Sequence, residues 1–289
     1  MLKKRNPHLA PREFWQLISL VGCVPKYLEE INPKETAEVN IKKYFFNPNQ
    51  FFFNEYDKIF SEIFGQKNSL YQKILITLNN NHLAPIDLAK KMRVQYEKTF
   101  SKAISDLELA GFLSRDFTWS LNEQESKLSK LRISDNYTRF YLKYIKSRKS
   151  RLTKLPLRST DSLHLVDWSI LFGLQIENVV LNNLASIIED LEIPNGEILH
   201  LGPYFQPPTR GKKGVQIDLL IQTRFKNLYL CEIKSSEKID TGIIDEVQEK
   251  INRLQKPRGA SIRPCLILIG EATVALKESC YFYKICHLD

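Results

Sequence analysis

The stretch Gln216–Ser236 carries three charged side chains within two segments that are otherwise apolar enough to be buried. Asp218 lies in the first segment, and Glu232 and Lys234 lie in the second. An isolated charge in an apolar interior costs several kcal/mol or shifts its pKa until the group is neutral. These three residues are therefore the first candidates for a functional site, and a partner must compensate the cost of burying their charges.

The two segments are predicted to form a β-hairpin, and its register decides whether the charges meet. Alternate side chains of a strand share a face, so Glu232 and Lys234 point the same way. A three-residue loop at Arg224–Lys226 would place Asp218 opposite Glu232. Two carboxylates would then stand side by side, with an ammonium group one step along.

Neighbouring carboxylates repel each other, and one becomes protonated unless a cation lies between them. Mg²⁺ is such a cation, because it takes oxygen ligands and is commonly held by one or two carboxylates together with waters and substrate phosphates. We therefore expect Asp218 and Glu232 to bind Mg²⁺ or Mn²⁺, and Lys234 to serve the attacking water or the phosphate. The alternative is a structural ion pair, although one lysine can neutralise only one of the two carboxylates.

Glu177 is a further candidate, in a single long helix expected over residues 167–191. A stripe with spacings of four and three residues runs along this helix, and only Glu177 in it is charged. The stripe consists of Ile170, Leu174, Glu177, Leu181, Leu184, Ile188 and Leu191. A charge within a buried stripe needs a partner, and a metal-binding carboxylate cluster would supply one. Taken alone, a glutamate at the edge of an amphipathic helix is the simpler interpretation.

The elements that must position these residues occur in the order helix, strand, hairpin, helix, strand. This order predicts an α/β fold with a mixed sheet flanked by helices. The expected strands are "EILHLG", "QIDLLIQT", "LYLCEIKSS" and "RPCLILIG", with a helix at "DTGIIDEVQEKINRLQK" and a further core strand in the ending "YFYKICHLD". A basic helical segment leads into this domain, which is expected over residues 136–289, and residues 155–163 are expected to be a linker within it.

Residues 55–135 predict a separate, mostly helical domain. Apolar residues recur with a helical period through four segments, the last of which ends at Gly111, and two short strands follow. Helices followed by a two-stranded wing are typical of a winged helix-turn-helix domain. Residues 1–54 predict short helices that are too few to hold a core of their own.

Basic side chains in two places are candidates for contacts with DNA phosphates. Lys98, Lys102 and Arg115 lie in the winged helix, where the simpler interpretation is a solvated surface or a packing module. Arg210, Lys212 and Lys213 lie in the loop "PTRGKKG" just before Asp218, where the simpler interpretation is a flexible turn.

Composition limits the class of protein. The chain has 289 residues with a net charge of +9, which allows a nucleic-acid partner without requiring one. The five cysteines include no CxxC pair, so we expect free thiols in a reducing compartment. The N-terminus lacks a secretory signal and no apolar run is long enough to span a membrane, so a cytoplasmic location without membrane attachment is expected. The oligomeric state cannot be read from the sequence.

The pattern of Asp218, Glu232-x-Lys234 and an upstream helical Glu177 resembles the PD-(D/E)XK nuclease fold of restriction endonucleases and archaeal Holliday-junction resolvases. The resemblance implies that the three carboxylates bind Mg²⁺ and that Lys234 assists the attacking water. The proline of the family name is absent, because Ile217 precedes Asp218.

A longer resemblance covers most of the chain. "GCVPKYLEEINP", the winged helix and "GVQIDLLI…LCEIKSS", in this order, resemble the C-terminal half of a group of prokaryotic AAA+/STAND-type ATPases. The resemblance implies that residues 1–54 are the remnant of an ATPase lid and that an ATPase region or partner operates with the chain. The sequence contains no G-x-x-x-x-G-K-[ST], so no ATP hydrolysis is expected.

Together these observations predict a Mg²⁺-dependent, endonuclease-like DNA phosphodiesterase domain coupled to a winged-helix DNA-binding module. The alternative is a catalytically inactive DNA-binding or protein-interaction module of an AAA+-type ATPase.

Overall fold

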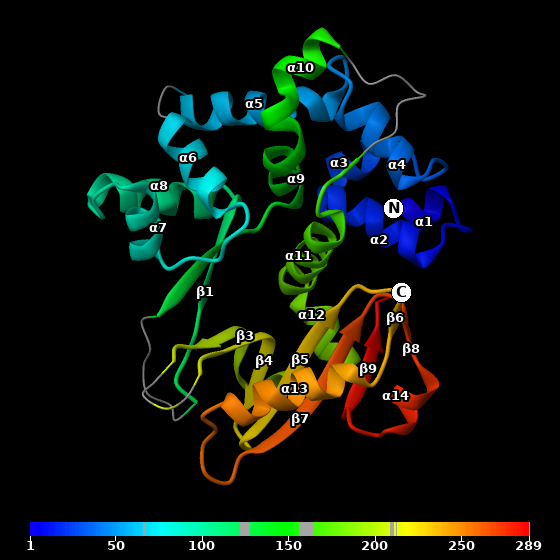
Figure 1. The fold of residues 1–289 in the computed structure, drawn as a ribbon, viewed down its shortest axis with the longest axis vertical. Coiled ribbons are helices and arrows are strands. Elements are labelled where there is room, and N and C mark those ends of the chain that lie inside the picture. Colours follow the sequence, from blue (N-terminus) through cyan, green and yellow to red (C-terminus); the bar gives the residue numbers. More distant parts are fainter. Residues whose placement is uncertain (66–67, 122–127, 156–163, 209–210, 212, 289) are drawn as a thin grey trace. The chain divides into compact units, whose positions relative to one another are not determined.

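The computed structural model describes residues 1–65, 68–121, 128–155, 164–208, 211 and 213–288 (Figure 1). These residues form two compact units. The first comprises Met1–Arg115 and Lys130–Gln175, and the second comprises Asp116–Ser129 and Ile176–Asp289. The first is largely helical, and the second is built on a five-stranded mixed sheet. The predicted α/β class with a helical N-terminal region is therefore confirmed.

The N-terminal part of the first unit is a set of short helices around an aromatic core. They are α1 (Leu2–Arg5), α2 (Pro11–Val21), α3 (Pro25–Glu30), α4 (Ala37–Asn40), the π-helix η1 (Ile41–Phe45) and α5 (Phe51–Phe64). Pro25 occupies the first turn of α3, where its missing N–H costs no helical hydrogen bond, and Gly22 ends α2 with a φ of 64°. The rings of Phe45 and Phe52 stack with centroids 4.2 Å apart.

The next elements have the order expected of a winged helix. They are α6 (Asn68–Leu78), α7 (Pro85–Met92), α8 (Lys98–Leu109), β1 (Leu113–Phe117) and β2 (Ser129–Ile133). Leu83 forms an isolated antiparallel bridge with Leu131. The predicted apolar face of α8 is buried, including Phe100, Ile104 and Leu107, which confirms the period of that helix.

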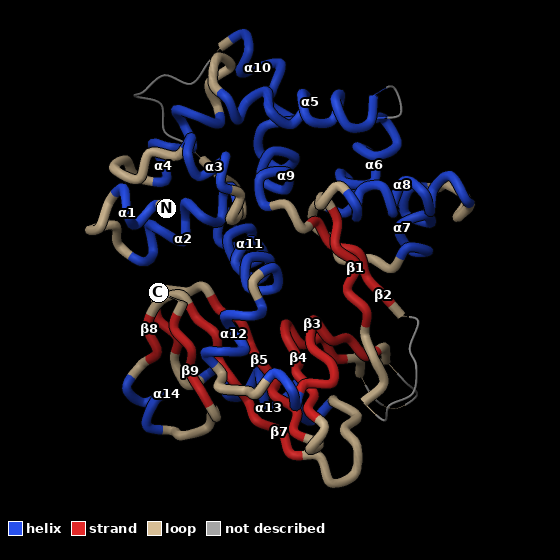
Figure 2. Tube along the Cα trace, turned by 180° about the vertical axis from the view of Figure 1, so that it is seen from behind, coloured by secondary structure: helices blue, strands red, loops and turns tan. Residues whose placement is uncertain are grey.

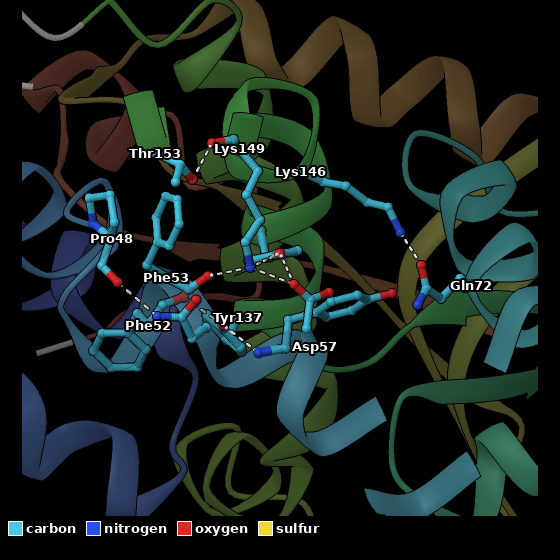
Figure 3. A network of polar contacts seen from close by, with 12 residues as sticks. Pro48, Phe52, Phe53, Asp57, Gln72, Tyr137, Lys146, Lys149 and Thr153 are labelled. Atoms are coloured by element: carbon cyan, nitrogen blue, oxygen red, sulfur yellow. Dashed lines mark hydrogen bonds and ion pairs between the residues drawn. The ribbon is translucent and has the colours of Figure 1, made fainter. Parts of the chain in front are cut away.

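The helical segment after β2 packs against α5 and pairs charged groups with it. It comprises α9 (Asn136–Phe140), the π-helix η3 (Tyr141–Ile145), the 3₁₀-helix η4 (Lys146–Arg148) and α10 (Lys149–Lys154). Figure 3 shows the Lys149 ammonium paired with the Asp57 carboxylate. Lys149 also donates to the Phe53 carbonyl at 3.1 Å, and the Tyr141 hydroxyl donates to Asp57 Oδ2 at 3.1 Å. We call these four residues the Asp57 network. The predicted linker falls mostly on residues 156–163, outside the described residues.

The single long helix predicted over residues 167–191 is wrong, because the chain bends by 83° between α11 (Trp168–Asn182) and α12 (Leu184–Asp190). The break lies at Asn183, whose side-chain amide donates to the Val179 carbonyl at 2.7 Å. Such local side-chain bonds compete with the helical hydrogen-bond ladder. The predicted stripe is therefore interrupted, and Ile170 at its start is 61% exposed.

The second unit contains a mixed sheet with the strand order β3-β4-β5-β7-β9. Its strands are β3 (Ile198–Gln206), β4 (Val215–Thr223), β5 (Asn227–Lys234), β7 (Ser261–Leu268) and β9 (Lys284–His287). The first three are antiparallel, and β5, β7 and β9 are parallel. The remaining elements are η5 (Asn195–Glu197), α13 (Gly242–Arg253), α14 (Val274–Glu278) and a small parallel pair of β6 (Lys238–Ile239) and β8 (Glu271–Ala272). The predicted core strand at the chain end is thus confirmed as β9.

Helices cover both faces of this sheet, which fixes the orientation of the strands that carry the charged residues. On one face, α13 packs through residues that include Val247 against a layer that includes Leu230. On the other face, α12 packs through Ile187 and Ile188 against a layer that includes Cys231. Figure 1 shows α13 crossing the sheet, and Figure 2 shows the sheet from behind. Side chains of β5 therefore alternate between two covered layers.

Two observations bear on the expectations from composition. None of the five cysteines forms a disulfide; Cys231, Cys265 and Cys286 are buried, and Cys23 and Cys280 are exposed. Within the described ranges, no single helix is both long and apolar enough to cross a membrane.

Candidate functional site

The hairpin of β4 and β5 has the predicted register. Its loop is Arg224–Lys226, and Lys226 adopts a left-handed φ of 59°. The strands pair Leu219 with Cys231, which brings Asp218 beside Glu232 at the next position. Asp218 Oδ2 accepts a hydrogen bond of 3.0 Å from the backbone N–H of Ile233, so the carboxylate is held against the neighbouring strand.

Glu232 is the most deeply buried of the predicted site residues that the structure describes, with 3% of its surface exposed. Its Oε1 lies 3.1 Å from the Lys234 ammonium, which also contacts Glu246 Oε2 on α13 at 2.8 Å. The structure therefore brings Asp218, Glu232 and Lys234 together, as the hairpin pattern predicted.

Lys250 of α13 is a site residue that the sequence analysis missed. Its ammonium is ion-paired with Glu232 Oε2 and lies 3.6 Å from Asp218 Oδ1. The sequence contained a signal for this residue. A stripe with spacings of four, three and four residues consists of Ile243, Val247, Lys250 and Leu254, and Lys250 is its one charged member. We call Asp218, Glu232, Lys234 and Lys250 the Asp218 cluster.

The electrostatics of the Asp218 cluster keep both lysines charged. Burial raises the pKa of Asp218, and the Glu232 carboxylate adds to this effect, while Lys250 opposes it. Burial disfavours the Lys250 ammonium, but the carboxylates of Asp218 and Glu232 outweigh it and raise the pKa of Lys250. For Lys234, burial is likewise outweighed by the hydrogen bond to Glu246 and by Glu232, and its pKa is raised. Two ammonium groups thus compensate the buried pair of carboxylates.

The atoms of the cluster fit a divalent cation at one position. Asp218 Oδ1 and Glu232 Oε2 both face the Lys250 ammonium, so a single cation can lie within reach of both oxygens. Two carboxylate oxygens with waters completing the shell is a common way to bind Mg²⁺. The donor set of this chain therefore fits the expected metal.

Glu177 lies half-buried on α11. Among the residues that the structure describes, no three His, Cys, Asp or Glu side chains gather closely enough to hold a metal ion. The three-carboxylate arrangement with Asp218 and Glu232 is therefore not assembled in this structure, and the role of Glu177 stays a prediction.

The basic residues predicted to contact DNA differ in their exposure and in the partners they already have. Lys98 at the start of α8 and Lys102 one turn later are exposed. Arg115 is held by Glu108 in two hydrogen bonds of 2.7 and 3.1 Å, so its guanidinium is already engaged. Lys213 is exposed, and Arg210 and Lys212 lie outside the described residues.

Comparison with known proteins gives no family. No family model matches the chain, and no curated protein matches it. Solved structures that resemble it include a repair endonuclease from Pyrococcus abyssi, at 14% identity and a TM-score of 0.27, over 45% of this chain and 50% of that chain. The transcriptional regulator SlyA matches at 14% identity and a TM-score of 0.24, over 48% of this chain and 88% of that chain.

Protein VC1899 from Vibrio cholerae matches a larger part of the chain, at 13% identity and a TM-score of 0.29. The match covers 83% of this chain and 53% of that protein, so this chain spans about half the length of VC1899 and of the repair endonuclease. All three TM-scores lie below 0.5. The function is therefore argued from the residues of this chain.

Proposed function

We propose that the second unit is a divalent-metal-dependent phosphodiesterase of the PD-(D/E)XK type that acts on DNA. The observation that supports this proposal best is the convergence of Asp218, Glu232 and Lys234 at one end of the β4–β5 hairpin. Two neighbouring carboxylates in a largely buried position are unfavourable for folding, and a site that needs both offers a reason to keep them. The winged helix of α6–α8 is proposed to bind the same DNA.

Asp218 Oδ1 and Glu232 Oε2 are the atoms that would hold Mg²⁺ or Mn²⁺. When bound, such an ion lowers the pKa of a coordinated water and offsets charge on a phosphate. The Lys234 ammonium, tethered between Glu232 and Glu246, would orient the attacking water and donate to a phosphate oxygen. The backbone N–H of Ile233 would keep the Asp218 carboxylate turned toward the shared position.

The winged helix would supply affinity for the DNA backbone. Lys98 and Lys102 lie on α8, the second helix of the helix-turn-helix pair, and their exposed ammonium groups can reach phosphates. The net charge of +9 favours such an encounter. An ATPase partner, which the resemblance to AAA+/STAND-type proteins predicts, would move or remodel the DNA.

A second candidate function is a non-catalytic DNA-binding or protein-interaction module. It is favoured by Lys250, because two lysines and two carboxylates balance their charges within the Asp218 cluster without a metal. In that case the cluster would be a structural ion network.

Cleavage by the purified full chain separates the two candidates. Linear, branched and single-stranded DNA would be incubated with EDTA, Mg²⁺ or Mn²⁺, in the presence and absence of ATP. The variants are Asp218→Asn and Glu232→Gln, with Asp57→Asn as a matched control from the Asp57 network.

We expect metal-dependent cleavage by the wild type and by Asp57→Asn, and none by the other two variants. Intact DNA under every condition, with equal DNA binding in EDTA and Mg²⁺, would instead support the non-catalytic module.

A further inference from the structure

We propose that Lys250 is a built-in competitor of the divalent cation. Its ammonium occupies the position between Asp218 and Glu232 when no ion is bound, and binding of the ion displaces it. The inference rests on the proposed function and adds that Lys250 sets the affinity of the same site for the metal ion.

The four carboxylate oxygens of the cluster have different partners. Asp218 Oδ2 accepts from the Ile233 N–H, and Glu232 Oε1 lies against Lys234. The two remaining oxygens, Asp218 Oδ1 and Glu232 Oε2, both face Lys250. An ion shared by the two carboxylates would use these same two oxygens, so the ion and the ammonium group compete for one position.

The two cations exclude each other there. A protonated lysine has three donors and no acceptor, so it cannot become a ligand of the ion and only repels it. The flexible stem of Lys250 allows it to leave, and 23% of its side chain is already exposed to solvent. The helix need not move, because Ile243 and Val247 of α13 remain anchored in the core.

This exchange has two consequences. Lys250 keeps the carboxylate pair compensated before the ion arrives, so the unit folds without metal. It also weakens the apparent affinity for the ion, because only molecules in which Lys250 has left the position can bind it.

Calorimetric titration of the full chain with Mn²⁺, after removal of metal with EDTA and dialysis, tests the inference. The variant is Lys250→Met, with Lys250→Gln as a second variant in case the first does not fold. The matched control is Lys284→Met, which removes the same charge from an ion pair of 2.8 Å with Glu192 in the same unit.

We expect Lys250→Met to bind Mn²⁺ at least about tenfold more tightly than the wild type. This factor corresponds to a wild type in which Lys250 has left the position in about a tenth of the molecules or fewer. Its melting temperature in EDTA should be lower than that of the wild type, and its rise with Mn²⁺ larger. Lys284→Met should titrate like the wild type.

Two results would overturn the inference, and they differ in what they leave standing. If Mn²⁺ binds the wild type, and binds both Lys250 variants equally tightly or more weakly, Lys250 does not compete with the ion. The metal site itself would then remain. Absence of Mn²⁺ binding in the wild type and in both variants would remove the metal site together with the inference.

Discussion

The Asp57 network of the first unit and the Asp218 cluster of the second use the same residue types in different ways. In the first, one carboxylate with a side chain that is 49% exposed pairs with Lys149 and a tyrosine hydroxyl. In the second, two neighbouring carboxylates share the ammonium of Lys250, Lys234 also contacts one of them, and the side chain of Glu232 is only 4% exposed. The first arrangement balances one charge with one charge. The second places two carboxylates side by side in a mostly buried position, where two of their oxygens can share one divalent ion.

The largest expected difference between the two regions is in stability. Glu232→Ala removes the buried partner that Lys234 and Lys250 share, although Glu246 and Asp218 still pair with them, and we expect it to cost about 1.5–3 kcal/mol of unfolding free energy. Asp57→Ala removes a partly exposed partner, and we expect a loss of about 0.2–1 kcal/mol. Urea denaturation of the full chain measures both. Equal losses of unfolding free energy in the two variants would mean that the Asp57 network and the Asp218 cluster contribute equally to stability.

Lys234→Met separates catalysis from metal binding. Because Lys234 contacts Glu232 through Oε1 and, outside the cluster, Glu246, the two oxygens proposed for the ion stay in place. We expect cleavage to fall by about 10²–10³-fold, the usual loss when one hydrogen-bond donor to the developing charge is removed. Mn²⁺ should still bind in a calorimetric titration. Loss of Mn²⁺ binding in this variant would contradict the role assigned to Lys234.

His82 makes the first unit sensitive to acid. Burial, together with the charges of Arg139, Arg132 and Lys130, lowers the pKa of His82 from 6.5 to about 4. Between these values the unfolded chain binds a proton that the folded chain does not, so the unfolding free energy falls as the pH falls. The loss is at most about 3 kcal/mol.

The comparison of wild type with His82→Gln isolates this effect from the other titrating groups. The variant should lose less stability than the wild type between pH 6.5 and pH 4. Parallel curves for the two proteins would show that His82 carries none of the acid sensitivity.

The smallest expected effect is on DNA affinity. Replacing Lys98 or Lys102 by alanine should each reduce the slope of log K against log salt by about 0.9, the value for one phosphate contact. Arg115→Ala should leave the slope unchanged, because Glu108 already holds that guanidinium. Fluorescence anisotropy over a salt series measures the slopes. A slope that changes with Arg115 but not with the lysines would place the DNA on another surface.

Local patterns in the sequence were sufficient for the hairpin and for α8. The register of β4 and β5 follows from a three-residue loop and from alternation along each strand, so Asp218 and Glu232 could be placed side by side. The period of α8 likewise depends on neighbouring residues alone.

The features that the sequence analysis missed depend on tertiary packing in one case and on a local side-chain bond in the other. Lys250 reaches the carboxylates only because α13 packs on the β5 face, although its place in the apolar stripe was a usable signal. The break at Asn183 depends on a side-chain bond to Val179 that competes with a helical pattern still continuing in the sequence. Glu177 lies on α11 before this break, and its role stays a prediction.

A crystal of the full chain soaked in Mn²⁺ and measured at an anomalous wavelength tests the central claim most directly. We predict one anomalous peak within roughly 2.0–2.6 Å of Asp218 Oδ1 and Glu232 Oε2, the ligand range of hard divalent cations, with the Lys250 ammonium moved away. A cluster without a peak, in which Lys250 still bridges the two carboxylates, would contradict the account and leave a structural ion network.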